Sequence, residues 1–181
     1  MGDDLVEITR GDYDVELDIV YATDRNFTGQ VIYQDARCWL HPSAAVCLRT
    51  AIASARMVGL KLKIFDAWRP PQAQDALWKY LPDPSYVADP SVGSNHSRAV
   101  AVDVTLIDSQ GDELDMGTRY DEMSMASWHS CDRLTVVAQK NRLLLLGIML
   151  AAGFSYLESE WWHYELPGAR HFPLRWQPCS T

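Results

Sequence analysis

The segment Ala99–Leu106, with the sequence AVAVDVTL, decides the fold because this short β-branched run predicts a buried strand in the middle of the chain. Before it, residues 85–98 are loop-like, and after it, residues 108–131 are polar and irregular. Further upstream, Leu60–Phe65 (LKLKIF) alternates strictly between apolar and polar residues. That alternation predicts a second strand, so the centre of the chain is expected to be a sheet.

Two helices are predicted on the N-terminal side of this strand. The first opens with HPS at residues 41–43, continues through an Ala-rich stretch to Met57 and is followed by Gly59. A proline near the start of a helix and a glycine just past its end are the usual boundary signals. The second helix is expected over roughly Gln72–Tyr80, where two prolines follow.

The two ends of the chain supply the remaining elements. Residues 12–22 (DYDVELDIVYA) alternate in polarity and predict a strand, and Glu160–Leu166 (EWWHYEL) is aromatic-rich and strand-like. Asp132 is expected to cap a long helix that runs to Ala152, with Gly153 at the C′ position. Strictly alternating βαβ units are absent, so we expect an α+β fold with helices packed on a mostly antiparallel sheet.

The composition limits the classes of protein and partner. The chain has 181 residues without a repeat or linker, which predicts a single small domain over residues 1–181. The net charge is −8 and Lys and Arg form no block, so a nucleic-acid partner is not expected. The longest apolar run, Leu143–Ala152, has 10 residues and is too short to insert into a membrane. The acidic N-terminus is no secretory signal, which favours a cytoplasmic location over a periplasmic one reached by a leader removed earlier.

The four cysteines have no CxxC spacing, which argues against a thiolate zinc cluster and against a thioredoxin-like redox pair. We expect mostly buried or incidental thiols, with disulfides as the alternative in an oxidising compartment. The cysteines are Cys38, Cys47, Cys131 and Cys179. The sequence does not indicate an oligomeric state.

Two segments carry candidate catalytic chemistry, SNHSRAVAVD at 94–103 and EWWH at 160–163. A catalytic zinc site needs three His or carboxylate ligands, with a fourth position open for water. Such ligands are available in His96, Asp103 and His163, with Glu160 nearby to take a proton. Odd separations within an ideal strand place residues on opposite faces, so these pairs converge only if one member lies off the regular strand. By spacing alone, ordinary surface or core histidines remain the alternative.

The segment SNHSRAVAVDVTL resembles the SxHxxGxAxD pattern of the D-Ala-D-Ala dipeptidases, the VanX-type zinc peptidase family, and EWWH is similar to that family's ExxWH. Three further stretches resemble the family in the same order. They are YAT with NFTG from Tyr21, DAWRP from Asp66 and DMGTRYD from Asp115. The resemblance extends from about Tyr21 to about Pro167, and five ordered motifs are far more specific than any one of them.

This resemblance implies a small α+β enzyme that uses one Zn²⁺ per chain to hydrolyse the dipeptide D-Ala-D-Ala to two D-alanine molecules. It implies zinc ligands at His96, Asp103 and His163, a general base and acid at Glu160, and a stabiliser of the tetrahedral intermediate at Arg69. It also implies that the termini of the dipeptide are held by Tyr21, Ser94 and Asp121. The family prefers Gly where this chain has Ala99, and a positive φ there would cost an alanine about 1 kcal/mol.

Several alternatives remain open at this level. Arg69 could form an ordinary surface salt bridge with Asp66, Tyr21 could pack in the core, and Asp121 could cap a loop. His129, in the irregular stretch, could compete as a ligand, although no motif supports it. For the whole protein, the rivals are a zinc D,D-carboxypeptidase or endopeptidase acting on larger peptidoglycan peptides, and a non-catalytic zinc-binding module. A pure binder needs neither a general base nor the arginine.

Overall fold

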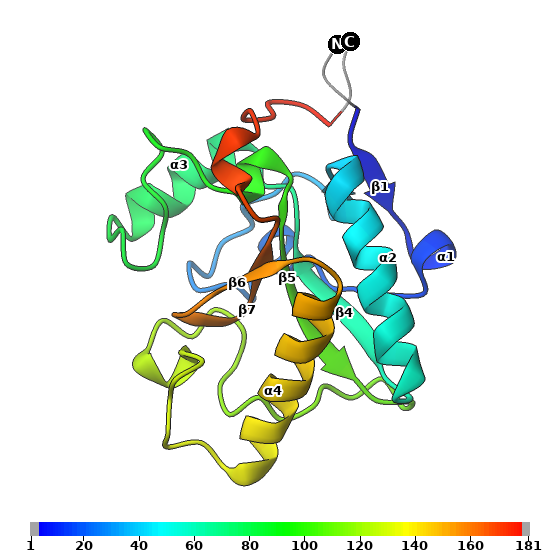
Figure 1. Cartoon of the computed structure of the whole chain (residues 1–181). Coiled ribbons are helices and arrows are strands. Elements are labelled where there is room, and N and C mark those ends of the chain that lie inside the picture. The colour runs from blue at the N-terminus through cyan, green and yellow to red at the C-terminus, as the bar shows by residue number, and fades with distance from the viewer. Residues whose placement is uncertain (1–3, 179–181) are drawn as a thin grey trace.

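A five-stranded sheet forms the centre of the computed structural model, which describes residues 4–178 (Figure 1). Its strands, in spatial order, are β2 (Glu16–Leu17), β4 (Lys61–Asp66), β5 (Ala101–Ile107), β7 (Glu160–Glu165) and β6 (Ser155–Leu157). The pair β2–β4 is parallel and the other three pairs are antiparallel. The predicted α+β fold with a mostly antiparallel sheet is therefore confirmed. A separate antiparallel pair, β1 (Val6–Ile8) with β3 (Cys38–Leu40), was not predicted.

Two long helices, α2 (Pro42–Met57) and α4 (Val136–Ala151), contact each other and pack on the sheet. The imidazole of His41 caps α2 by accepting a hydrogen bond from the backbone N–H of Ser43, so the predicted start of this helix is confirmed. The predicted cap of α4 is wrong, because Thr135 rather than Asp132 accepts a hydrogen bond from the N–H of Ala138. Asp and Thr are both good caps, so the sequence alone could not choose between them.

The shorter elements include α3 (Pro71–Tyr80), which confirms the second predicted helix. The others are α1 (Arg10–Tyr13) and the 3₁₀ turns η1 (Val20–Ala22), η2 (His96–Arg98), η3 (Met125–Ser127) and η4 (Ala169–His171). The strand predicted over residues 12–22 is wrong for most of its length. Thr9 caps α1 through the N–H of Asp12, and Asp14 ends that helix in the left-handed region at φ 41°. These local bonds leave only Glu16–Leu17 to pair as β2.

A row of polar residues crosses the three central strands. In the pairing register, Asp66 of β4 lies opposite Asp103 of β5, and Asp103 lies opposite His163 of β7. The β4–β5 ladder shifts register between Ile64 and Asp66. Because neighbouring residues in register point to the same side of a sheet, the three side chains emerge together on one face.

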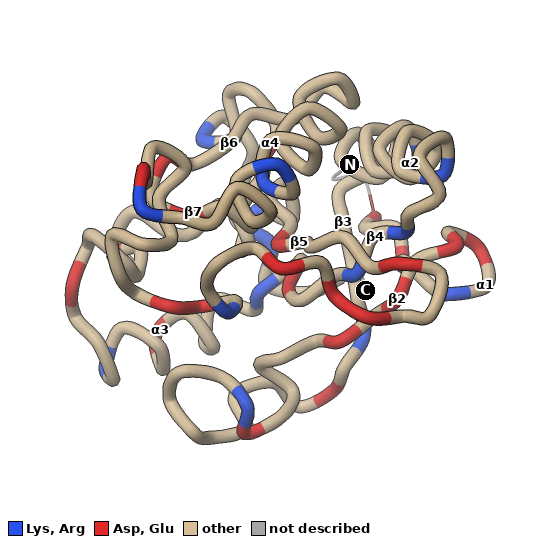
Figure 2. Tube along the Cα trace, turned by 90° about the horizontal axis from the view of Figure 1, so that it is seen from below, with Lys and Arg blue, Asp and Glu red and all other residues tan. Residues whose placement is uncertain are grey.

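The remaining expectations concern cysteines, charge and membranes. Cys38, Cys47 and Cys131 are free thiols, and Cys179 lies outside the described residues. Lys and Arg are dispersed around the trace rather than gathered on one side (Figure 2). Between residues 4 and 178, no helix is both long enough and apolar enough to span a bilayer.

Candidate metal centre and active site

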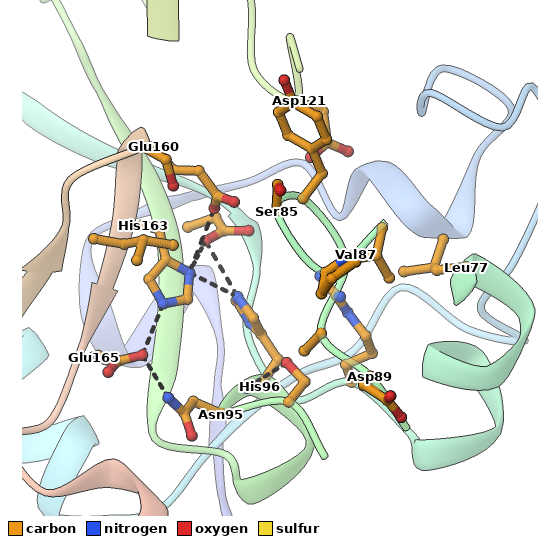
Figure 3. A pocket seen from close by; sticks show the side chains of 18 of the residues that line it. Leu77, Ser85, Val87, Asp89, Asn95, His96, Asp121, Glu160, His163 and Glu165 are labelled. Carbon is orange, nitrogen blue, oxygen red and sulfur yellow. Dashed lines mark hydrogen bonds and ion pairs between the residues drawn. The ribbon is translucent and has the colours of Figure 1, made fainter. Parts of the chain in front are cut away.

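His96, Asp103 and His163 meet around one point in the structure, and Figure 3 shows the rings of the two histidines side by side. Nε2 of His96 lies 3.2 Å from Nδ1 of His163 and 3.2 Å from Oδ1 of Asp103. Nδ1 of His163 lies 3.1 Å from the same oxygen. All three side chains are buried, so this cluster of two nitrogens and one oxygen is shielded from bulk water.

The local backbone explains why His96 and Asp103 converge although they are an odd number of residues apart in the sequence. Asp103 and His163 are register partners on β5 and β7, whereas His96 lies off the strand in η2. The residue after that turn, Ala99, adopts φ 59° and donates its backbone N–H to the carbonyl of His96. This left-handed residue reverses the chain between η2 and β5. The structure therefore has a positive φ at the position where the family pattern has Gly, and Ala99 bears the associated strain.

The outer nitrogen of each histidine ring is already engaged. Nδ1 of His96 lies 2.7 Å from the carbonyl oxygen of Ala67, and Nε2 of His163 lies 3.0 Å from Oε2 of Glu165. Glu165 also accepts a hydrogen bond from the side-chain amide of Asn95 at 2.7 Å. Since a carbonyl or carboxylate oxygen only accepts, each outer nitrogen carries an N–H, and the inner nitrogen of the neutral ring then presents a lone pair.

This donor set fits a zinc ion. When both rings are neutral, two imidazole lone pairs and one carboxylate oxygen face one another, and such atoms repel unless a cation lies among them. Zinc bonds of about 2.0–2.1 Å in a tetrahedron place neighbouring ligand atoms roughly 3.3 Å apart. The observed separations of 3.1 and 3.2 Å are close to that value. Histidines oriented by second acceptors are also the usual arrangement around protein-bound metals.

The neighbouring carboxylates act strongly on His163. Burial lowers the pKa of His163, but hydrogen bonds to Asp103 and Glu165 outweigh that effect and raise it to about 10. Burial favours the neutral form of Asp103, but the charge of His96 and the hydrogen bonds from both histidines lower the pKa of this carboxyl. Oδ2 of Asp103 accepts from the hydroxyl of Tyr120 at 3.0 Å, so Oδ1 faces the histidines. A metal would bind here in competition with protons.

Glu160 lies beside this cluster at the start of β7. Its Oε2 is 3.9 Å from Nδ1 of His163, and within the described chain its carboxylate makes no hydrogen bond. Burial raises the pKa of Glu160 above its usual value, which favours proton uptake. The β6–β7 ladder shifts register between Tyr156 and Leu157, and Leu157 pairs with Glu160, so the regular strand pairing is interrupted beside this residue.

Arg69 forms a buried ion pair with Asp66, with Nη2 of the guanidinium 2.7 Å from Oδ2 of the carboxylate. The anticipated partner is therefore present, but the pair is buried rather than on the surface. Nη1 also donates to Oε1 of Gln74 at 2.9 Å, and Nε lies 3.3 Å from the hydroxyl of Tyr33. A guanidinium has five N–H groups, so these bonds leave one on each terminal nitrogen for a ligand.

Tyr21 and Asp121 form the opposite part of the site. The Tyr21 hydroxyl donates to Oδ2 of Asp121 at 2.6 Å, and the Tyr21 ring also packs against Tyr33. Burial raises the pKa of Asp121 to about 8, and the backbone of this residue is left-handed at φ 62°. Ser94 is buried, and its hydroxyl oxygen accepts a hydrogen bond from the backbone N–H of His96 at 3.2 Å. Its hydroxyl hydrogen is then available to a ligand.

One cavity of about 430 Å³ joins all of these groups. Each site residue named from the sequence lines it: Tyr21, Arg69, Ser94, His96, Asp103, Asp121, Glu160 and His163. Its walls also include Trp162, Met123 and Arg170. Figure 3 shows Glu160 on one side of His163 and Glu165 with Asn95 on the other. A volume of this size is typical of a small-molecule site with a few convergent polar groups.

The sequence did not predict the partners that orient the ligands. Glu165 lies two residues beyond His163, and a period of two in a strand puts both on one face, which was an available signal. The positions of Tyr120 and Gln74 had no comparable signal, because they depend on loop and helix packing. His129 is not part of the cluster. Its ring packs against Tyr156 and Tyr164, and burial lowers its pKa to about 4.

Comparison with known proteins agrees with these motifs. The chain is 50% identical over 161 residues to a D-alanyl-D-alanine dipeptidase of Escherichia coli (strain K12), with 89% of this chain and 83% of that protein covered. It is 31% identical over 176 residues to a D-alanyl-D-alanine dipeptidase of Enterococcus faecalis (strain ATCC 700802 / V583), with 84% of this chain and 86% of that protein covered.

A crystal structure of a mutant vancomycin resistance D,D-pentapeptidase, VanY, in complex with Zn(II) aligns with a TM-score of 0.47 and 15% sequence identity, covering 86% of this chain and 80% of that one. That score is too low to establish a shared fold. The family model described as D-ala-D-ala dipeptidase matches residues 2–177, which is nearly the whole length. The chain is therefore a member of the D-Ala-D-Ala dipeptidase family of peptidases.

Proposed function

We propose that this protein, as a single catalytic domain over residues 1–181, hydrolyses the free dipeptide D-Ala-D-Ala to two molecules of D-alanine with one zinc ion per chain. The observation that carries the proposal is the cluster of His96, Asp103 and His163, whose inner donor atoms lie 3.1 to 3.2 Å apart. The names of the relatives and the family support the substrate. The substrate partner is a small dipeptide.

His96, Asp103 and His163 would hold the zinc at the wall of the cavity that they line. Zinc held there would supply a water of lowered pKa and would polarise the scissile carbonyl. His96 and His163 serve this purpose only as neutral imidazoles, and the carbonyl of Ala67 and the carboxylate of Glu165 hold the required tautomers. The donor set has one negative charge in Asp103, so a bound divalent cation keeps a net positive charge.

Glu160 moves the protons of the reaction. Its carboxylate takes a proton from the attacking water and delivers it to the amine that leaves when the peptide bond breaks. Two properties of this residue suit that role. It makes no hydrogen bond within the described chain that would occupy its lone pairs, and its raised pKa brings the proton affinity closer to neutral pH. General acid–base catalysis of this kind contributes roughly 10²–10⁴-fold in rate.

Arg69 stabilises negative charge on the carbonyl oxygen as the peptide carbon becomes tetrahedral. Its ion pair with Asp66 and its bond to Gln74 hold the guanidinium plane in one orientation. The two N–H groups that remain are therefore fixed before substrate binds, and preorganised donors need no reorganisation in the transition state.

The ends of the dipeptide are recognised by the polar groups of the cavity. Asp121, aligned by the hydroxyl of Tyr21, accepts the α-ammonium group, and Ser94 donates its hydroxyl hydrogen to the substrate. An ammonium group beside Asp121 favours the ionised carboxylate, so substrate binding lowers the raised pKa of this residue. A third amino acid would place a neutral amide where this charge is expected.

The test is metal analysis combined with D-alanine release. Purified protein should contain about one equivalent of zinc, and the zinc-loaded enzyme should release D-alanine from D-Ala-D-Ala. His163→Ala should lose most of the zinc, whereas His129→Ala, outside the cluster, should retain it. Absence of D-alanine release from a zinc-loaded protein would refute the proposal. Faster cleavage of a peptidoglycan pentapeptide than of the dipeptide would favour the carboxypeptidase or endopeptidase alternative.

A further inference from the structure

Arg142 is a buried arginine on α4 that takes no part in the proposed chemistry. Its side chain is 1% exposed, and within the described residues it forms no ion pair with a carboxylate. Its guanidinium instead donates to three backbone carbonyls. Nε lies 2.6 Å from the oxygen of Met116, Nη1 lies 2.9 Å from that of Trp128, and Nη2 lies 2.9 Å from that of Ala126.

These carbonyls belong to the two ends of one segment, residues 116–128, here called the 116–128 loop. One planar guanidinium therefore joins the start of the loop at Met116 to its end at Ala126 and Trp128. Asp121, the proposed ammonium acceptor, lies between these ends. The fixed fork of an arginine can hold several acceptors in one plane, which a lysine ammonium cannot do.

The same arginine also connects the loop to the catalytic strand. Oγ1 of Thr118 accepts from Nη2 of Arg142 at 3.4 Å and from the indole N–H of Trp161 at 2.8 Å. Trp161 is the residue after Glu160 on β7. The loop is thus hydrogen-bonded to both α4 and β7, and Oγ1 of Thr118 accepts a bond from each.

Retaining a cation in this place is costly for the fold. Burial of a charged group without a counter-ion is unfavourable even when its hydrogen bonds are satisfied. Burial also lowers the pKa of Arg142. An apolar side chain on this face of α4 would avoid the cost, but it would leave the three carbonyls without these donors. The benefit of Arg142 therefore lies in the geometry of the loop rather than in core packing.

We propose that Arg142 is a positioning residue that closes the 116–128 loop and thereby holds Asp121 against the hydroxyl of Tyr21, which sets the affinity for the ammonium end of the dipeptide. Arg142 does not line the cavity and does not touch substrate. Its effect passes through the loop backbone to the 2.6 Å contact between Tyr21 and Asp121. This inference rests on the proposed role of Asp121 in substrate binding.

The test compares Arg142→Lys with Leu145→Ala in zinc-loaded enzyme. Leu145 is fully buried about one turn further along α4, and its side chain has no hydrogen-bond donor for the loop carbonyls, so its truncation controls for general loss of stability. Arg142→Lys should raise KM for D-Ala-D-Ala roughly tenfold to a hundredfold, the range for losing one hydrogen bond to a charged group. Its kcat and zinc content should change little, which is the pattern of lost ground-state binding. Leu145→Ala should lower the melting temperature without raising KM.

A double-mutant cycle with Asp121→Asn shows whether the effect passes through Asp121. In the Asp121→Asn background, Arg142→Lys should raise KM no further, because the contact that it positions is already lost. An undiminished KM increase in that background would overturn the proposal, and so would equal KM values for Arg142→Lys and Leu145→Ala. If Arg142→Lys fails to fold, Arg142→Met with its apolar stem replaces it in the same cycle.

Amide hydrogen exchange tests the loop without relying on activity. Amides of residues 117–127 should exchange faster in Arg142→Lys than in Leu145→Ala, whereas amides of β5 should not differ between the two. If the wild-type enzyme does not hydrolyse D-Ala-D-Ala, the proposed function fails, and exchange alone then decides whether Arg142 holds the loop. Unchanged exchange of the loop would overturn the positioning role whatever the substrate.

Discussion

Replacing Asp121 by asparagine should stabilise the fold, and the gain should increase with pH. Burial raises the pKa of this carboxyl from an ordinary 3.8 to about 8. At a pH between these two pKa values, Asp121 has released its proton in the unfolded chain and has kept it in the folded chain. Stability therefore falls as pH rises through this window, by about 1.4 kcal/mol per pH unit. Asparagine, which has no proton to lose, avoids this cost while retaining an oxygen for the hydroxyl of Tyr21.

The magnitude follows from the same pKa shift. The free energy of unfolding of Asp121→Asn should exceed that of the wild type by at most about 4 kcal/mol at pH 7. This difference should grow by about 3 kcal/mol between pH 5 and pH 7. Urea unfolding of zinc-free protein at pH 5, 6 and 7 measures it, because a bound cation would itself lower the pKa of Asp121. Asp89→Asn is the matched control, since Asp89 lies at the same cavity but hydrogen bonds to Ser91 lower its pKa. If the difference in the free energy of unfolding between Asp121→Asn and wild type does not change from pH 5 to pH 7, the reasoning is refuted.

Three further predictions concern catalysis. Glu160→Ala should keep its zinc, measured by metal analysis, yet lose roughly 10²–10⁴-fold in kcat, and near-normal turnover would remove Glu160 from proton transfer. Arg69→Lys should lower kcat and kcat/KM together, by about 10²-fold for one lost oxyanion donor. A rise in KM alone would make Arg69 a ground-state binding residue. N-acetyl-D-Ala-D-Ala should be cleaved roughly 10- to 100-fold less efficiently than the free dipeptide, because its neutral amide removes the ammonium group that Asp121 accepts. Comparable kcat/KM values for the two substrates would contradict this assignment.

Much of the candidate site could be predicted because its residues lie in short, ordered motifs. The segments 94–103 and 160–163 contain the three candidate ligands and Glu160, and the alternation of LKLKIF and the β-branched run before Ile107 located the central strands. These signals are local in the sequence, so they can be recognised without knowledge of the tertiary structure. The helices α2 and α3 were predictable for the same reason, since proline and glycine mark their ends.

The remainder depends on long-range pairing that periodicity does not encode. The strand expected over residues 12–22 failed because Thr9 and Asp14 form a local turn that outcompetes the ladder. The bond between Tyr21 and Asp121 joins residues 100 positions apart, and no local pattern predicts it. Likewise, the buried state of the Arg69 ion pair follows from the packing of α3, through Gln74, against the end of β4.

The polar row across the sheet has a consequence for folding. Asp66, Asp103 and His163 share one face because the three strands pair in a defined register, which includes the shift of the β4–β5 ladder between Ile64 and Asp66. A slip of β7 by one residue relative to β5 would turn His163 to the opposite face of the sheet. A partly folded chain with a slipped strand therefore lacks a complete ligand set and does not retain the ion. Metal uptake during refolding should consequently report the moment at which β7 locks into its native alignment.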